Sequence, residues 1–113
     1  MHEMGVVINI VQIAEQFARE NDADKVGRLV LQIGEISSVI PHYVEACWPG
    51  AIENTMLSEA ELVIEIVPGH GACQGCGKVY NLLEHDLKCP ECDSDEWEVI
   101  SGREVMIKEI GVY

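Results

Sequence analysis

Residues 73–92 read CQGCGKVYNLLEHDLKCPEC, and this stretch decides how the rest of the chain can fold. Cys73 and Cys76 form one C-x-x-C turn, Cys89 and Cys92 form a second, and twelve residues separate the two turns. Each turn aims two thiolates at one point, and a hairpin between them brings both pairs around a tetrahedral ion. The spacing therefore predicts a four-cysteine metal site in a ribbon of its own.

Zinc(II) is the best occupant of such a site, because four soft thiolates suit it and the closed set leaves no position for a substrate. A rubredoxin-like iron site would use the same ligands, and the proline in CPEC is compatible with it. A thioredoxin-like dithiol would place one C-x-x-C at the start of a helix after a strand, and a disulfide framework is disfavoured in a cytoplasmic chain. We expect Gly75 and Gly77 to supply the positive φ that the turns require.

The ribbon is poor in apolar side chains, which are Val79, Tyr80, Leu82, Leu83 and Leu87. They are too few to offset the chain entropy of about 30 residues. Zinc binding contributes about 10–16 kcal/mol in finger peptides, so a bound ion can supply the missing stability. The stretches NLLEHDLK and DSDEWE make the ribbon acidic, which favours a protein partner over nucleic acid.

The segments on either side of the ribbon predict an α+β fold, in which a small antiparallel-type sheet is covered by two helices. Apolar residues at three- and four-residue spacing predict a helix over 6–18, and Pro41 starts a second helix that Pro49 should kink or split. Strands are predicted at 26–36, 60–67, 97–100 and 104–110. Residues 1–68 plus 104–113 are expected to form one domain, and 69–103 an inserted zinc-binding domain that swings on Gly69 and Gly71.

The charge balance limits the partners of the protein. Seven Lys and Arg stand against 20 Asp and Glu, a formal charge of −13. Such a field repels phosphate backbones and anionic membrane surfaces, so we expect neither nucleic acid nor membrane as a partner. Neither a signal peptide nor a membrane span is predicted, and the expected location is the cytoplasm.

The chain begins Met1-His2-Glu3, before any apolar run. The α-amine of Met1, the backbone amide of His2 and its Nδ1 can close two chelate rings, with the amide of Glu3 or an outside group completing a plane. Nickel(II) and copper(II) accept square-planar nitrogen donors, whereas zinc does so poorly. Taken by themselves, the three residues are a weak signal, and the simpler interpretation is an ordinary terminus with no role in binding.

The order of features resembles the HypA/HybF family of nickel metallochaperones. The shared features are the MHE start, an amphipathic helix, a strand ending in IGE with Ser37 after it, a second helix, an acidic strand and CxxC-x12-CPxC. The resemblance covers essentially all 113 residues. It implies nickel(II) cargo at Met1, His2 and Glu3 and structural zinc at the four cysteines. It also implies delivery to the [NiFe]-hydrogenase large subunit together with the GTPase HypB.

Several expectations complete this interpretation. His70 and His85 are candidate accessory residues, as metal-linked groups or pH sensors, and Cys47 is expected to be a small buried hydrophobe. Relative to the family, Gly5 should weaken the start of the first helix. No acid–base pair or nucleophile can be read from the chain, so no enzyme is predicted. The alternative function is a zinc-ribbon adaptor without a nickel role. A second copy of the chain, in a homodimer, is a further candidate partner.

Overall fold

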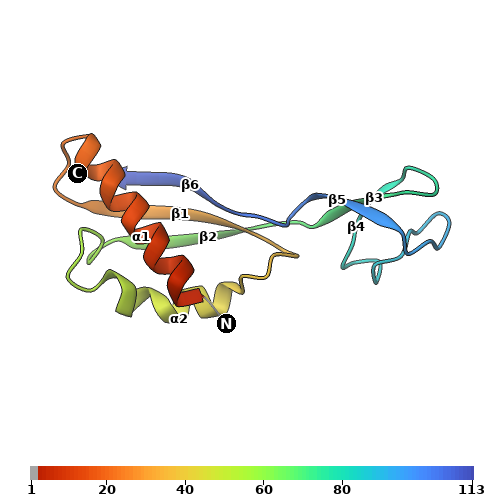
Figure 1. The fold of residues 1–113 in the computed structure, drawn as a ribbon, viewed down its shortest axis with the longest axis horizontal. Helices are drawn as coiled ribbons and strands as arrows, with labels where there is room; N and C mark the ends of the chain where they lie inside the picture. Colours follow the sequence, from red (N-terminus) through yellow and green to blue (C-terminus); the bar gives the residue numbers. More distant parts are fainter. Residues whose placement is uncertain (1–2) are drawn as a thin grey trace.

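The computed structural model describes residues 3–113 as two sheets that lie end to end. The elements are α1 (Glu3–Glu20), β1 (Val26–Gly34), α2 (Pro41–Ile52), β2 (Glu61–Val67), β3 (His70–Cys73), β4 (Val79–Asn81), β5 (Trp97–Ser101) and β6 (Val105–Val112). The strand orders are β2-β1-β6 and β4-β3-β5. The molecule measures 54 × 27 × 17 Å (Figure 1). Within residues 3–113, no helix has the length and apolar character needed to cross a bilayer.

The predicted α+β class is confirmed. The larger sheet is mixed, however, so the prediction of antiparallel pairing is only half right. β1 pairs antiparallel with β6, yet it pairs parallel with β2, where Leu29 faces Leu62 and Ile33 faces Ile66. The cause is α2, which carries the chain from the end of β1 back to the start of β2. Parallel neighbours require such a crossover.

The core of this layer lies between the sheet and the two helices. α1 crosses the strands diagonally and α2 packs beside it (Figure 1). The buried apolar residues of α1 recur at helical spacing, as predicted. They are Val7, Ile10, Val11, Ala14 and Ala18, and they meet Leu29, Leu31 and Ile33 of β1 and Val44 and Trp48 of α2.

Pro49 does not split α2, so that half of the prediction was wrong, and the kink stays a prediction. The helix runs from Pro41 through Pro49 to Ile52. Pro49 lacks the amide that would bond to the carbonyl of Glu45. Both residues are exposed, so the Glu45 carbonyl lies on the solvent side of the helix, where water can replace the missing amide donor. Likewise, α1 starts at Glu3 and continues through Gly5.

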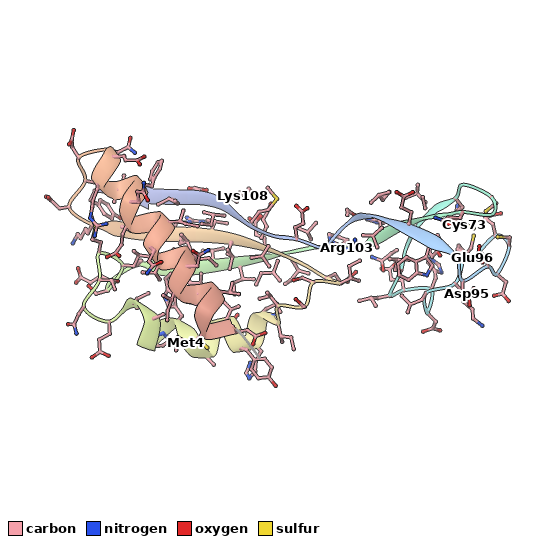
Figure 2. The ribbon with its side chains drawn as sticks, in the orientation of Figure 1. Met4, Cys73, Asp95, Glu96, Arg103 and Lys108 are labelled. Atoms are coloured by element: carbon pink, nitrogen blue, oxygen red, sulfur yellow. The ribbon has the colours of Figure 1, made fainter. Side chains whose placement is uncertain are left out.

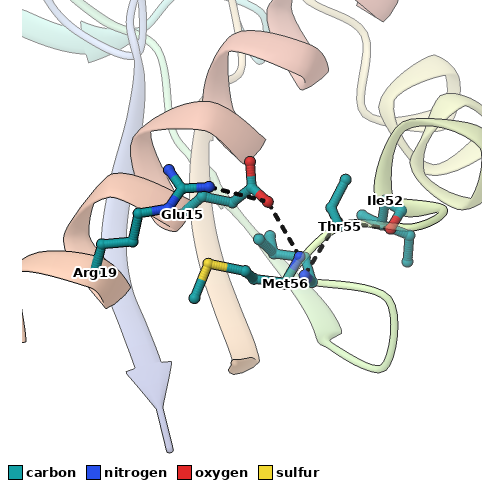
Figure 3. A network of polar contacts seen from close by, with 6 residues as sticks. Glu15, Arg19, Ile52, Thr55 and Met56 are labelled. Carbon is teal, nitrogen blue, oxygen red and sulfur yellow. Dashed lines mark hydrogen bonds and ion pairs between the residues drawn. The ribbon is translucent and has the colours of Figure 1, made fainter. Parts of the chain in front are cut away.

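Glu15 ties α1 to the loop that follows α2 (Figure 3). Its Oε2 accepts a hydrogen bond from the Met56 amide at 3.1 Å and lies 4.0 Å from Arg19 Nη2. In the same loop, the Thr55 hydroxyl donates to the Ile52 carbonyl at 2.6 Å. The last turn of α2 is thereby fixed to α1, which keeps the helix pair together over the sheet.

Three glycines meet where the two sheets join, and they allow backbones to approach closely. A Cβ on Gly34 would lie 2.0 Å from the carbonyl oxygen of Gly102, and a Cβ on Gly102, whose φ is +85°, would lie 2.5 Å from Cα of Gly69. The Gly69 amide donates to Glu35 Oε1 at 3.0 Å, and Gly71 lies inside β3. Both glycines are thus held by hydrogen bonds, and the expectation that the zinc-binding domain swings on Gly69 and Gly71 stays a prediction.

Candidate metal centre

The four predicted cysteines meet in one cluster, and Figure 2 shows its member Cys73 at the end of the smaller sheet that lies away from the larger one. Their Sγ atoms all lie within 4.8 Å of one another. Cys73 and Cys92 are 3.4 Å apart, and Cys76 and Cys89 are 3.5 Å apart. A tetrahedral zinc with Zn–S bonds of about 2.3 Å needs sulfurs about 3.8 Å apart, so small side-chain adjustments accommodate the ion. The donor set and its closeness fit a structural zinc site.

The two cysteine turns have the same hydrogen-bond pattern, which makes the site symmetrical. In the first, the Gly77 amide donates to the Cys73 carbonyl at 2.8 Å, and the Cys73 amide donates to the Lys78 carbonyl at 2.8 Å. In the second, the Asp93 amide donates to the Cys89 carbonyl at 2.8 Å, and the Cys89 amide donates to the Ser94 carbonyl at 2.9 Å. Each turn thus presents its two sulfurs from a closed backbone loop.

Left-handed backbone occurs directly after each second cysteine. Gly77 has φ of +78°, as predicted, but Gly75 is not among the residues with positive φ. The matching residue of the second turn is Asp93, with φ of +60°. Aspartate is one of the few residues that tolerate this conformation, and it was not predicted because no glycine marks the position.

Amide donors set the proton affinities of the sulfurs. The amide of Cys76, helped by that of Gly75, lowers the pKa of Cys73 to about 6 against the effect of burial. At Cys92 the Ser94 amide lowers the pKa, but contacts with the Cys73 thiol and burial outweigh it, and the pKa rises to about 12. The metal-free site therefore holds protons at neutral pH. Metal binding must release them, so affinity should rise with pH.

The core under the site is small. Its buried members are Cys73, Tyr80, Leu82 and Cys89, and Ile36, Trp97 and Val99 pack against them half-buried. Ile36 belongs to the loop after β1, so the larger layer contributes one side chain to the core of the ribbon. This confirms that the ribbon has little apolar stabilisation of its own.

Neither candidate accessory histidine belongs to the cluster of four ligand atoms found among residues 3–113. His70 opens β3 at the junction, where its amide and Nδ1 lie 3.2 Å and 3.1 Å from Ser101 Oγ. The ring of His85 stands edge-on to Tyr80, with ring centres 5.9 Å apart. Their sensing roles stay predictions.

The amino-terminal candidate site lies mostly outside the described residues, which exclude Met1 and His2. Glu3 is described and opens α1. It is only 4% exposed, and its Oε1 is buried without a hydrogen-bond partner in the described part of the chain. A buried carboxylate oxygen without a hydrogen-bond partner is costly, so a cation is a natural neighbour for it. Next to it, Met4 lies beside α2 (Figure 2).

The fold and the cysteine cluster define a small α+β protein that carries a four-cysteine metal-binding ribbon. Residues 1–112 match the family described as hydrogenase/urease nickel incorporation, metallochaperone, hypA. The hydrogenase maturation factor HypA of Geobacter metallireducens is 38% identical over 112 residues, 99% of each chain. The same factor of Aquifex aeolicus is 36% identical over 97% of this chain and 96% of its own. The chain belongs to the HypA family.

Solved structures agree with this assignment. The solution structure of the nickel metallochaperone HypA from Helicobacter pylori superposes with a TM-score of 0.70 at 25% identity, over 99% of this chain and 97% of that one. A second solution structure of a HypA protein gives 0.72 at 26% identity, over 100% of this chain and 97% of that one. The chain is therefore a member of a nickel metallochaperone family of hydrogenase maturation, with nickel as cargo and a set of four cysteines suited to structural zinc.

Proposed function

We propose that the protein binds Ni(II) through Met1, His2 and Glu3 and delivers it to the large subunit of a [NiFe]-hydrogenase. Cys73, Cys76, Cys89 and Cys92 would hold the structural zinc. The observation that carries the proposal is the family match, which starts at residue 1 and so includes the MHE terminus. The alternative, an adaptor without a nickel role, has no comparable support.

The chemistry of the terminus explains why nickel would be the cargo. An amine, an imidazole and deprotonated amides offer nitrogen donors in one plane, which suits Ni(II) and not Zn(II). Glu3 follows these donors directly in the sequence, and its buried Oε1, which has no hydrogen-bond partner in the described part of the chain, would be an oxygen donor for the same ion. Because the donors lie at a chain end, an acceptor protein can reach the ion and exchange the ligands one at a time.

The two parts of the chain would then have separate roles in metal binding. Residues 1–68 plus 104–113 would be the nickel-binding unit, and 69–103 the zinc-binding unit. The sequence contains no GxxxxGK[ST] loop, so a HypB-type GTPase would supply any nucleotide hydrolysis. The protein itself would transfer metal in the cytoplasm without catalysing a reaction, and a homodimer remains a testable form.

A pair of histidine variants tests the proposal. His2→Ala removes the imidazole donor of the terminus, whereas His42→Ala removes an imidazole in the first turn of α2 that is not among the proposed ligands. Calorimetric nickel titration should find the high-affinity site lost in His2→Ala and kept in His42→Ala. Zinc content should be unchanged in both. Equal nickel binding by the two variants would contradict the proposal and favour the adaptor.

A further inference from the structure

The chain leaves β1 between the two linkers that join the layers, near the place marked by Arg103 in Figure 2. The Glu35 amide donates to the Val67 carbonyl at 2.8 Å, at the end of β2, and the Ile36 amide donates to the Gly102 carbonyl at 2.9 Å, between β5 and β6. The segment after β1 therefore continues the larger sheet up to the ribbon, with one backbone hydrogen bond to each side.

The side chain of Glu35 extends from this segment to the ribbon. Its Oε1 accepts the Gly69 amide at 3.0 Å and Asn81 Nδ2 at 3.2 Å. Asn81 lies in β4, and its Oδ1 accepts the Glu84 amide at 3.0 Å, which orients the NH₂ group towards the carboxylate. Among residues 3–113, no other side chain of the larger layer hydrogen-bonds to a strand of the ribbon.

Ile36 adds an apolar contact beside this bridge. Its side chain is half-buried against the small core of the ribbon, and a Cβ on Gly69 would lie only 2.9 Å from Ile36 Cγ2. Apolar burial is not directional, so this contact holds the ribbon close without fixing its angle. Hydrogen bonds weaken steeply when their angle changes, so the two bonds of Glu35 are what define the orientation of the ribbon.

We propose that Glu35 is a positioning residue that locks the ribbon in one orientation on the larger layer, and that the ribbon swings on its linkers only after both bonds of Glu35 break. Glu35 is exposed, so water can replace the two bonds and the release is reversible. A locked ribbon presents one fixed surface, together with the larger layer, to a docking partner. The lock gives a role to the Ile-Gly-Glu segment at 33–35 that metal binding does not supply.

The test measures residual dipolar couplings of the backbone amides in the whole, zinc-loaded chain, because two rigidly joined layers share one alignment tensor. Glu35→Ala removes the acceptor, whereas the side-chain oxygen of Glu35→Gln can still accept both bonds. Glu45→Ala alters an exposed glutamate of α2 and is the control. In Glu35→Ala the ratio of released to locked molecules should rise about 5- to 100-fold, the size of two hydrogen bonds, and the ribbon should require a separate, smaller tensor. Glu35→Gln and Glu45→Ala should fit one tensor, as the unchanged protein does.

A single tensor in Glu35→Ala overturns the proposal. Two tensors in the unchanged protein also overturn it, because the lock would then be open in solution. Two tensors in Glu35→Gln count against it, since that variant keeps the acceptor. Should Glu35→Ala not fold, Asn81→Ala removes the bond to β4 from the ribbon side and decides by the same criterion. None of these outcomes depends on nickel, so failure of the lock leaves the proposed function standing.

Discussion

Truncation of Leu82 should weaken zinc binding, because the ribbon core is too small to compensate for the loss. Leu82 is completely buried, in a core of only four buried side chains. Its amide also donates to the Gly69 carbonyl at 2.9 Å, which holds the backbone near the junction and limits collapse around a cavity. Leu82→Ala therefore removes apolar contact that no neighbour can replace.

The expected magnitude follows from the coupling of folding to metal binding. A buried Leu→Ala change costs about 2–5 kcal/mol. If the ribbon folds only with its ion, this cost is subtracted from the binding free energy of the metal. At about 1.4 kcal/mol per factor of ten, zinc affinity should fall about 30- to 4,000-fold.

Leu83→Ala is the matched control, because the neighbouring leucine is 50% exposed. Chelator competition measures the zinc affinity of the two variants, and amide NMR of the larger sheet checks that the rest of the fold is intact. Leu83→Ala should bind zinc as the unchanged protein does. If Leu82→Ala binds zinc equally well, the ribbon is folded without metal and the reasoning is refuted.

Two further changes test the junction and the open face of the larger sheet. Gly34→Ala should lower the unfolding free energy by about 1–3 kcal/mol, because its Cβ would meet the Gly102 carbonyl, whereas Gly5→Ala, with nothing within 4 Å, should raise it by about 0.5–1 kcal/mol. Thermal unfolding of the two glycine variants measures these changes, and equal shifts in their melting temperatures would contradict the close contact between Gly34 and Gly102. Lys108 donates to both carboxylate oxygens of Glu65, at 3.0 and 3.3 Å, and lowers its pKa. The ion pair stabilises the fold at neutral pH, and this stabilisation is lost as the pH falls through the lowered pKa of Glu65. Lys108→Met should therefore raise the Glu65 pKa towards 4.5 in carboxyl NMR and make stability less dependent on acid. An unchanged Glu65 pKa would contradict the role given to Lys108.

Periodicity was enough to predict the elements but not how they pair. The apolar alternation in 60–67 is the same for a parallel and an antiparallel neighbour, so the strand was found and its direction was not. The helix between the two strands was the available signal, since a crossover connection makes parallel neighbours. The effect of Pro49 depended on the solvent exposure of its surroundings, which the sequence does not give.

Cysteine spacing predicted which sulfurs meet because two C-x-x-C turns leave few other arrangements. The supporting groups were harder to predict. Asp93 adopts the left-handed conformation without a glycine to mark it. Gly69 and Gly71 suggest a flexible linker in sequence, whereas the structure places Gly69 in close backbone contact with Gly102, where a Cβ on Gly102 would not fit.

The central claim, that the chain carries nickel at its terminus, is tested most directly by nickel titration of protein that begins at Met1 beside a copy with one extra residue ahead of it. The extension keeps every side chain and moves only the free α-amine. We predict one Ni(II) with the absorption of a square-planar centre in the first protein and loss of that centre in the second. Identical binding and spectra in both would contradict the claim and place nickel elsewhere on the chain.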